Sequence, residues 1–317
     1  MRIALIVLAF LSFSLAGPSL STGQAPAVIR VAISDTDLSA EPLYAKETGI
    51  FQRAGLDVRL SDSKRGGAGV IADIRAGTIE VGFSNLISIA AAVQRGDPVV
   101  LLAPAGIHKR SAPVNAIVQA PSSNYRTGAE LNGKTISSPS GPGSAGALAP
   151  AAWIDQTGGD SRTVHFVTGI EPFDIPAAFR EHRIDVAEMG DPDLTILRQR
   201  GEVKVLASPF DAIGDGYLLA GFVASKAWVQ ANPDAARRFV AAMRETARWA
   251  NAHRAETAVL LSKALKLAPA VVAAMSRTTY AEALTAAIVQ PPLDVAAKYG
   301  IIQPMKADDL IPALLPR

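Results

Sequence analysis

Short apolar runs alternate with amphipathic segments along most of this chain. Runs rich in β-branched residues predict strands, and apolar residues at helical spacing predict helices. In the first half, strands are predicted at 29–34, 56–60, 79–83 and 99–103, and helices at 42–53, 70–76 and 86–94. Because a helix follows each of the first three strands, this order predicts a parallel, doubly wound α/β sheet. The continuous apolar run 99–103 is typical of a buried parallel strand.

A second series of the same kind follows in the middle of the chain. Strands are predicted at 115–119, 134–137, 163–167, 184–188 and 203–207, and helices at 144–156, 175–181 and 194–200. After a further strand at 217–224 the pattern is almost entirely helical, and Asn232, Pro233 and Asp234 indicate a helix start with Asn232 as its N-cap. We therefore expect two lobes joined by a two-crossing hinge, with a cleft between them. Lobe one comprises 28–112 and 217–317, and lobe two comprises 113–216.

The two predicted lobes contain a weak internal repeat. Residues 74–82 align without gaps to residues 179–187, and both segments show a helix end, a tight turn and an acidic-apolar strand. A spacing of about 105 residues is far too long for a solenoid repeat. The repeat indicates two lobes built from the same α/β unit, or simply the similarity that any two α/β units can show.

Residues 1–27 are predicted to be a secretory signal peptide. Arg2 provides a positive start, and 3–16 is an apolar run of 14 residues, shorter than the roughly 20 residues that a membrane-spanning helix needs. Small residues allow cleavage after Ala16 or after Ala27. We therefore expect a periplasmic protein, with a buried N-terminal helix or an uncleaved anchor as the alternative.

Composition excludes several classes of protein. The chain has 31 Lys and Arg against 29 Asp and Glu, a net charge of +2, which argues against a nucleic-acid partner. The absence of cysteine excludes disulfides, thiolate metal sites and a cysteine nucleophile. The four histidines have no paired metal spacing, and no Gly-x-Ser-x-Gly elbow occurs. We expect no catalytic residue, no metal and no cofactor.

Small polar residues follow several predicted strands, at the ends where open α/β sheets bind ligands. In lobe one these candidates are Ser34, Asp35, Thr36, Asp37, Arg65, Gly66, Ser84 and Asn85. In lobe two and at the second crossing they are Ser138, Ser140, Gly143, Ser144, Ala145, Glu188, Asp191, Asp215 and Tyr217. Helix capping is the alternative role for Asp37, Asn85 and Asp191, because each precedes a predicted helix.

Residues 141–146 match the pattern Gly-x-Gly-x-x-Gly between a strand and a helix. A dinucleotide site is not expected there, because no acidic residue ends a second strand about 20 residues later. Serine hydroxyls and free backbone N–H groups at a helix start could instead hold an anion such as a carboxylate or sulfonate. An ordinary glycine-rich turn is the alternative. The acids Glu188, Asp191 and Asp215 leave open a ligand with an amine or ring N–H.

Residues 40–58 (AEPLYAKETGIFQRAGLDV) closely resemble the start of periplasmic solute-binding proteins of the nitrate/sulfonate/taurine type. Residues 76–82, 130–136 and 224–228 resemble later blocks in the correct order, so the resemblance spans about residues 28–260. It implies a type II periplasmic-binding fold and no catalytic residues. It also implies capture of a small anionic solute for an inner-membrane ABC permease with its cytoplasmic ATPase. We expect a monomer.

The chain departs from that family where members often carry Trp-Glu-Pro at the end of a strand in lobe two. Here the residues at 188–192 are EMGDP, so the resemblance does not specify the ligand. Two alternatives stay open. One is an enzyme related to pyrimidine-precursor synthases, although those relatives use a cysteine-rich iron motif that this chain lacks. The other is a secreted ligand-binding partner of a sensor.

Overall fold

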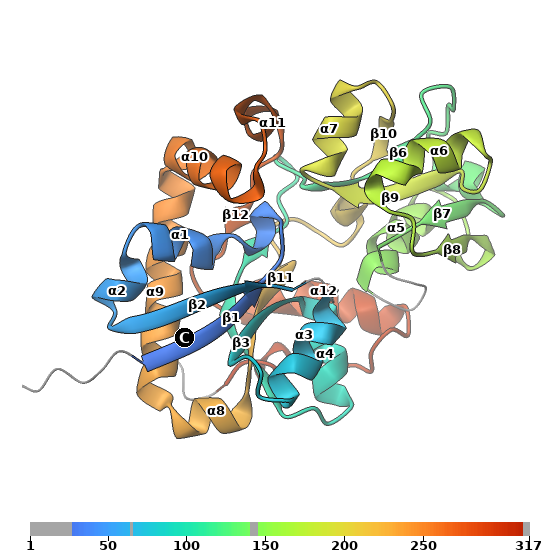
Figure 1. Ribbon diagram of the computed structural model, residues 1–317. Coiled ribbons are helices and arrows are strands. Elements are labelled where there is room, and N and C mark those ends of the chain that lie inside the picture. The colour runs from blue at the N-terminus through green and yellow to red at the C-terminus, as the bar shows by residue number, and fades with distance from the viewer. Residues whose placement is uncertain (1–26, 64–65, 140–144, 313–317) are drawn as a thin grey trace, which may run out of the picture.

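The computed structural model describes residues 27–63, 66–139 and 145–312, and it contains two five-stranded sheets (Figure 1). We call the part built on the first sheet lobe one and the part built on the second sheet lobe two. The first sheet has the order β2 (Leu56–Asp62), β1 (Ala27–Ile33), β3 (Val81–Asn85), β11 (Ala220–Ser225) and β4 (Val99–Pro104). The second has the order β10 (Lys204–Ala207), β6 (Asn115–Gln119), β9 (Val186–Gly190), β7 (Thr135–Ser137) and β8 (His165–Val167). A short pair, β5 (Gly106–Ile107) and β12 (Thr279–Tyr280), completes the strands of the described ranges.

Helices cover both faces of each sheet. In lobe one they are α1 (Glu41–Glu47), α2 (Ile50–Arg53), α3 (Gly66–Arg75), α4 (Leu86–Gln94), α8 (Lys226–Ala231), α9 (Pro233–Ala252), α10 (Arg254–Leu265), α11 (Pro269–Ala274) and α12 (Ala286–Lys298). In lobe two they are α5 (Ala145–Gln156), α6 (Ile175–Arg180) and α7 (Asp193–Gln199). In lobe one, α1, α2 and α9 pack on one core, and α3, α4 and α12 pack on another. The α/β architecture with two lobes agrees with the sequence prediction, whereas the exact boundaries at 112/113 and 216/217 stay a prediction.

The first sheet is mixed rather than parallel. Strands β2, β1 and β3 are parallel, as predicted. Strand β11 lies between β3 and β4 and is antiparallel to both. The strand predicted at 99–103 therefore runs in the same direction as β1–β3, but its pairing with a neighbour is antiparallel, not parallel as expected. The reason is topological: β11 enters the sheet on the return from lobe two and runs in the opposite direction. All six residues of β4 are buried, so its apolar pattern could not reveal the direction of its neighbour.

Two local predictions also need correction. The single helix expected at 42–53 is divided into α1 and α2, because Gly49 between them has a left-handed backbone with φ of +72°. Asn232 does not cap α9 with its side chain. Its amide group donates to the carbonyl of Trp228 instead, at 3.1 Å.

The internal repeat corresponds to equivalent structure in the two lobes. The turn after α3 places Gly77 at φ of +69°, and the turn after α6 places His182, 105 residues later, at φ of +54°. Gly77 N–H donates to the carbonyl of Ile74, and His182 N–H donates to that of Phe179. A non-glycine residue at positive φ is uncommon, although histidine adopts it more often than most, so both lobes use the same turn even without a glycine in it.

The acidic residue of the repeat also has the same role in both lobes. Glu80 accepts a hydrogen bond from the backbone N–H of Arg30 at 2.7 Å, at β1. Asp185 accepts one from the backbone N–H of Thr135 at 2.9 Å, at β7. Each carboxylate therefore satisfies a backbone donor of the neighbouring strand.

The two segments that connect the lobes lie side by side. The chain leaves lobe one after β5 and returns to it before β11. The backbone of His108 donates to Tyr217 and accepts from Gly216, at 2.8 and 2.9 Å. The backbone N–H of Arg110 donates to the Asp215 carboxylate at 3.0 Å. Asp215 and Tyr217 therefore tie the two connections together.

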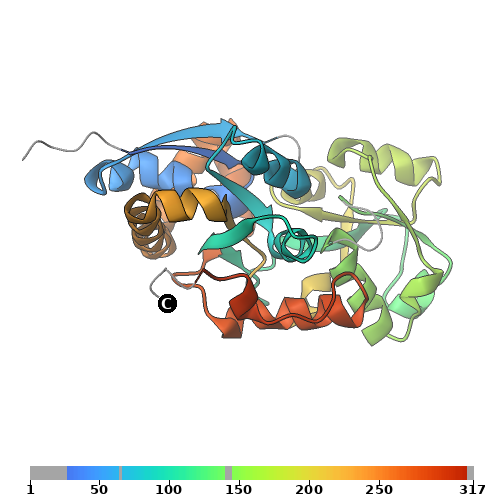
Figure 2. The same ribbon diagram turned by 90° about the horizontal axis from the view of Figure 1, so that it is seen from below.

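The lobes also touch away from these connections. Figure 2 shows α12 of lobe one beside α5 of lobe two. The Tyr299 hydroxyl, just after α12, donates to the Asp155 carboxylate of α5 at 2.7 Å. Leu148 of α5 packs into the lobe-one core that α4 and α12 share.

Candidate functional site

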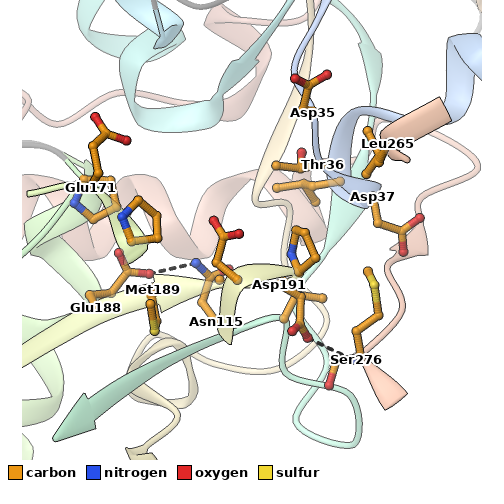
Figure 3. A pocket seen from close by; sticks show the side chains of 18 of the residues that line it. Asp35, Thr36, Asp37, Asn115, Glu171, Glu188, Met189, Asp191, Leu265 and Ser276 are labelled. Carbon is orange, nitrogen blue, oxygen red and sulfur yellow. Dashed lines mark hydrogen bonds between the residues drawn. The ribbon is translucent and has the colours of Figure 1, made fainter. Parts of the chain in front are cut away.

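A cavity of about 870 Å³ lies between the two lobes (Figure 3). Its wall on lobe one is formed by the loop after β1, the end of α10 and the segment after α11, with residues Asp35, Thr36, Asp37, Leu38, Ala264, Leu265, Lys266, Leu267, Met275, Ser276 and Thr278. Its wall on lobe two is formed at the ends of β6, β7, β8 and β9, with residues Val114, Asn115, Ser137, Ser138, Pro139, Gly169, Ile170, Glu171, Pro172, Ile175, Glu188, Met189, Gly190, Asp191, Pro192 and Asp193.

The cavity brings together some of the residues that the sequence indicated. Those in its wall are Asp35, Thr36, Asp37, Ser138, Glu188 and Asp191. Ser34 lines a smaller cavity of about 200 Å³, which shares Asp35, Thr36, Ala264 and Leu265 with the larger one. Gly66 begins α3, Ala145 begins α5, and Asp215 and Tyr217 lie in the second connection. Arg65, Ser140, Gly143 and Ser144 lie outside the described residues. Ligand contact stays a prediction for every residue of the set.

Asn85 caps a helix, and Ser84 is buried away from the cavities with a hydroxyl that has no hydrogen-bond partner among the described residues. Asn85 accepts a hydrogen bond from the backbone N–H of Ser88 at 2.7 Å and so caps α4, the alternative role noted from the sequence. Ser84 is 1% exposed and packs against Gly67, where an added Cβ would lie 2.4 Å from its hydroxyl. Neither side chain lines either cavity described above.

The Asp37 carboxylate is already occupied by partners within the protein. One oxygen accepts from Arg277 Nε at 2.9 Å and from the backbone N–H of Thr278 at 2.8 Å. The other accepts from the hydroxyls of Tyr44 and Tyr280, at 2.9 and 3.1 Å. Burial, followed by the nearby Asp37 charge, raises the pKa of both tyrosines, so they remain protonated donors. Asp37 therefore holds the loop after β1 against the C-terminal segment. Nothing in the sequence pattern indicated Arg277.

Glu188 and Asn115 form a polar pair in the wall on lobe two. Glu188 is the middle residue of β9 and is only 4% exposed. Its Oε1 accepts a hydrogen bond from Asn115 Nδ2 at 2.7 Å (Figure 3). Burial raises the pKa of Glu188 from 4.5 to about 7, because the interior disfavours the charged form. Asn115 was not a sequence candidate, because only the pairing of β6 with β9 brings it to Glu188.

Ser138 lies next to Glu188 on the neighbouring strand. The parallel pairing of β7 with β9 ends at Ser137 and Ala187, and continuing its register by one residue places Ser138, just after β7, beside Glu188. Ser138 is 2% exposed, and its hydroxyl has no hydrogen-bond partner in the described part of the chain. A buried hydroxyl without a partner is energetically unfavourable unless something else satisfies it.

Asp191 bridges the two lobes. Its Oδ1 accepts from the hydroxyl of Thr195 at 2.6 Å and from the backbone N–H of Thr195 at 3.1 Å, in the first turn of α7. Its Oδ2 accepts from the backbone N–H of Ser276 in lobe one at 2.9 Å (Figure 3). Burial raises the pKa of Asp191 above its ordinary value.

The charged groups in the described wall are mostly acidic. They are Asp35, Glu171, Glu188, Asp191, Asp193 and the single cation Lys266, in addition to Asp37, which is paired with Arg277. Burial, followed by the nearby charges of Asp191 and Glu171, raises the pKa of Asp193. No three acidic or histidine side chains within the described ranges are placed to hold a metal ion. No helix of those ranges is long and apolar enough to cross a membrane.

Two α/β lobes with a cavity between them define the architecture of a periplasmic-binding-protein fold. A model of the family described as NMT1/THI5 like matches residues 39–257, and the chain belongs to this family. No curated protein matches the sequence.

Solved structures of solute-binding proteins share this fold. The periplasmic aliphatic sulphonate-binding protein SsuA from Escherichia coli has a TM-score of 0.70 and 18% identity, over 90% of this chain and 92% of that chain. The alkanesulfonate-binding protein SsuA from Xanthomonas axonopodis, bound to MOPS, has a TM-score of 0.71 and 19% identity, over 93% of this chain and 99% of that chain. The periplasmic nitrate-binding protein NrtA from Synechocystis has a TM-score of 0.64 and 16% identity, over 77% of this chain and 68% of that chain.

Proposed function

We propose that this protein is an extracytoplasmic solute-binding protein that captures a small solute in the cavity between its lobes. The observation that carries the proposal is the cavity itself. Its volume of about 870 Å³ lies within the range of roughly 300–1,000 Å³ that is typical of small-molecule sites. Both lobes line it, so a solute bound there would contact both.

Capture would proceed by hinge closure of the lobes around the solute. The two connecting segments, tied together through Asp215 and Tyr217, provide a place where the lobes can rotate. Contacts that join the lobes, such as Asp191 with Ser276 and Tyr299 with Asp155, would form as the cavity closes.

Delivery to an ABC importer completes the proposal. The structurally similar proteins named above are sulfonate- and nitrate-binding proteins, and two of their names place them in the periplasm. We propose a periplasmic location for this chain, with residues 1–27 as the signal peptide. The proposed partner is an inner-membrane ABC permease with its cytoplasmic ATPase.

A thermal-shift screen of the purified protein tests the proposal. A solute that binds only the folded state raises the melting temperature in proportion to the logarithm of its concentration above Kd. We expect at least one small solute to do so, and we expect its binding to reduce the radius of gyration measured by small-angle X-ray scattering. Turnover of that solute would instead favour the enzyme alternative.

Two tryptophan substitutions on α10 provide a matched comparison. Leu265 lines the cavity, whereas Val259 is 69% exposed on the same helix. We expect Leu265→Trp to weaken solute binding by at least tenfold and Val259→Trp to leave it unchanged. Equal effects of the two substitutions would contradict the assignment of the cavity as the binding site.

A further inference from the structure

The charges and unsatisfied groups of the cavity indicate what kind of solute it accepts. We propose, in an inference that rests on the proposed function, that the solute carries a cationic nitrogen with N–H donors, such as an ammonium, amidinium or guanidinium group. This nitrogen is bound at Glu188, beside Ser138. The site is thus specific for a cation rather than for a sulfonate or nitrate anion.

The first observation is the free oxygen of Glu188. Its Oε1 is bonded to Asn115, whereas its Oε2 accepts no hydrogen bond from the described part of the chain. Figure 3 shows the Glu188 carboxyl in the wall of the cavity, with one oxygen turned to Asn115 and the other away from it. The side chain is 4% exposed, so water can satisfy it only from within the cavity. A cationic N–H donor is the strongest partner that a carboxylate can have.

The second observation is the hydroxyl of Ser138. It lies beside Glu188 in strand register, it is 2% exposed, and it lacks a partner among the described residues. A hydroxyl oxygen can accept a second N–H from the same nitrogen group. Glu188 and Ser138 therefore provide two adjacent unsatisfied acceptors, which is the arrangement that an ammonium or amidinium group requires.

The third observation is the charge of the remaining wall. Asp35, Glu171, Asp191 and Asp193 line the same cavity, and Lys266 is the one cationic side chain among the described lining residues. Carboxylates at the rim of an enclosed site attract cations and repel anions. An anionic solute would face this repulsion and would also leave Glu188 without a donor.

An organic cation fits the wall better than a metal ion does. No group of three acidic or histidine side chains in the described ranges converges closely enough to hold a metal. The cavity is also far larger than a single ion, at about 870 Å³. Apolar side chains in the wall, such as Ile170, Leu265 and Met189, can pack against the carbon skeleton of an organic solute.

Isothermal titration calorimetry with two panels of probes tests the inference. The cationic panel contains putrescine, agmatine and methylguanidine, and the anionic panel contains nitrate, sulfate, ethanesulfonate and propanesulfonate. We expect at least one cation to bind and no anion to bind. Glu188→Gln, which keeps the shape of the side chain, should weaken binding of that cation at least tenfold. Glu181→Gln, an exposed acid on the same lobe paired with Arg183, should leave it unchanged.

Proton exchange provides a second readout that a merely structural role of Glu188 would not produce. Because the pKa of Glu188 is about 7, a cation that binds to it should release protons near pH 7. An anion bound there should take protons up. The two cases are distinguished by titrations in buffers with different ionisation enthalpies, and Glu188→Gln should abolish the release.

The outcomes separate this inference from the proposed function. Binding of nitrate or a sulfonate, with no cation bound, would overturn the inference and leave the solute-binding function intact. Binding of a cation that Glu188→Gln does not weaken would overturn the assignment to Glu188. Binding of no member of either panel would count against both.

Discussion

The Asp191 carboxylate of lobe two accepts a hydrogen bond from the backbone N–H of Ser276 in lobe one, at 2.9 Å. The same carboxylate is bonded through its other oxygen to Thr195 at the start of α7. One side chain therefore joins the first turn of a helix in one lobe to the segment after α11 in the other. Both Asp191 and Ser276 line the cavity, so this hydrogen bond holds the two lobes together at the wall that encloses the site.

Removal of this link should favour the open arrangement of the lobes. Asp191→Ala deletes the bond to Ser276 and also the bonds to Thr195, so we expect a loss of about 1–2 kcal/mol in the free energy of unfolding. We also expect solute affinity to fall several-fold. Thr195→Val is the matched control, because it removes the hydroxyl bond within lobe two and keeps the bond to Ser276. Urea unfolding and calorimetry provide the measurements, and equal affinities of the two variants would contradict a role in closure.

The stability of the protein should depend on pH through Glu188. Its pKa is about 7 in the folded state and near its ordinary value of 4.5 in the unfolded state. The folded state therefore holds a proton that the unfolded chain loses, and stability falls as pH rises from about 4.5 to about 7. A shift of this size corresponds to about 3 kcal/mol. Relative to the wild type, Glu188→Gln should gain about that much stability between pH 4.5 and pH 8 in urea unfolding. Parallel curves for the two proteins would show that Glu188 is not buried as described.

The ion pair of Asp37 and Arg277 should contribute strongly to folding. The two side chains are 4% and 14% exposed, so loss of Arg277 leaves a buried carboxylate without its cation. We expect Arg277→Met to lower the free energy of unfolding by about 3–5 kcal/mol. The exposed pair of Arg53 and Glu245 is the control, and Arg53→Met should cost no more than about 1 kcal/mol. Similar losses in both variants, measured by chemical denaturation, would argue against the buried network.

Asn85 should act as a helix cap that other capping residues can replace. Asn85→Ala removes the acceptor for the backbone N–H of Ser88 and should cost about 1 kcal/mol. Asn85→Ser, which keeps a capping oxygen, should recover most of this stability. If both substitutions destabilise the protein equally in urea unfolding, Asn85 has a role beyond capping α4.

Much of the fold could be predicted because its signals are local. The repeat at 74–82 and 179–187 indicated the same helix end, turn and strand in both lobes, and both segments adopt it. The acid in each segment bonds to the backbone of the neighbouring strand, so a short stretch of sequence encodes both the element and its attachment. Helix α4 has the predicted bounds, since its apolar positions and its cap lie within ten residues of each other.

The direction of strands and the composition of the site could not be predicted in the same way. Strand β11 lies antiparallel between β3 and β4, although its apolar pattern is compatible with either direction. Asp37 meets Arg277 across 240 residues, and Glu188 meets Asn115 across 73 residues. These partners are brought together by the packing of whole elements, and no local pattern identifies them.

The sequence by itself determined the order and approximate position of most helices and strands up to β11, and it showed that acids and hydroxyls gather at strand ends, because periodicity and capping act over a few residues. The tertiary structure alone decided which of these polar groups are satisfied internally and which remain available. The side-chain oxygens of Asp37 and Asn85 accept hydrogen bonds from within the protein. Glu188 Oε2 and the Ser138 hydroxyl have no partner among the described residues, and both residues line the cavity between the lobes. The physical reason is that the availability of a buried polar group depends on every neighbour that packing brings to it.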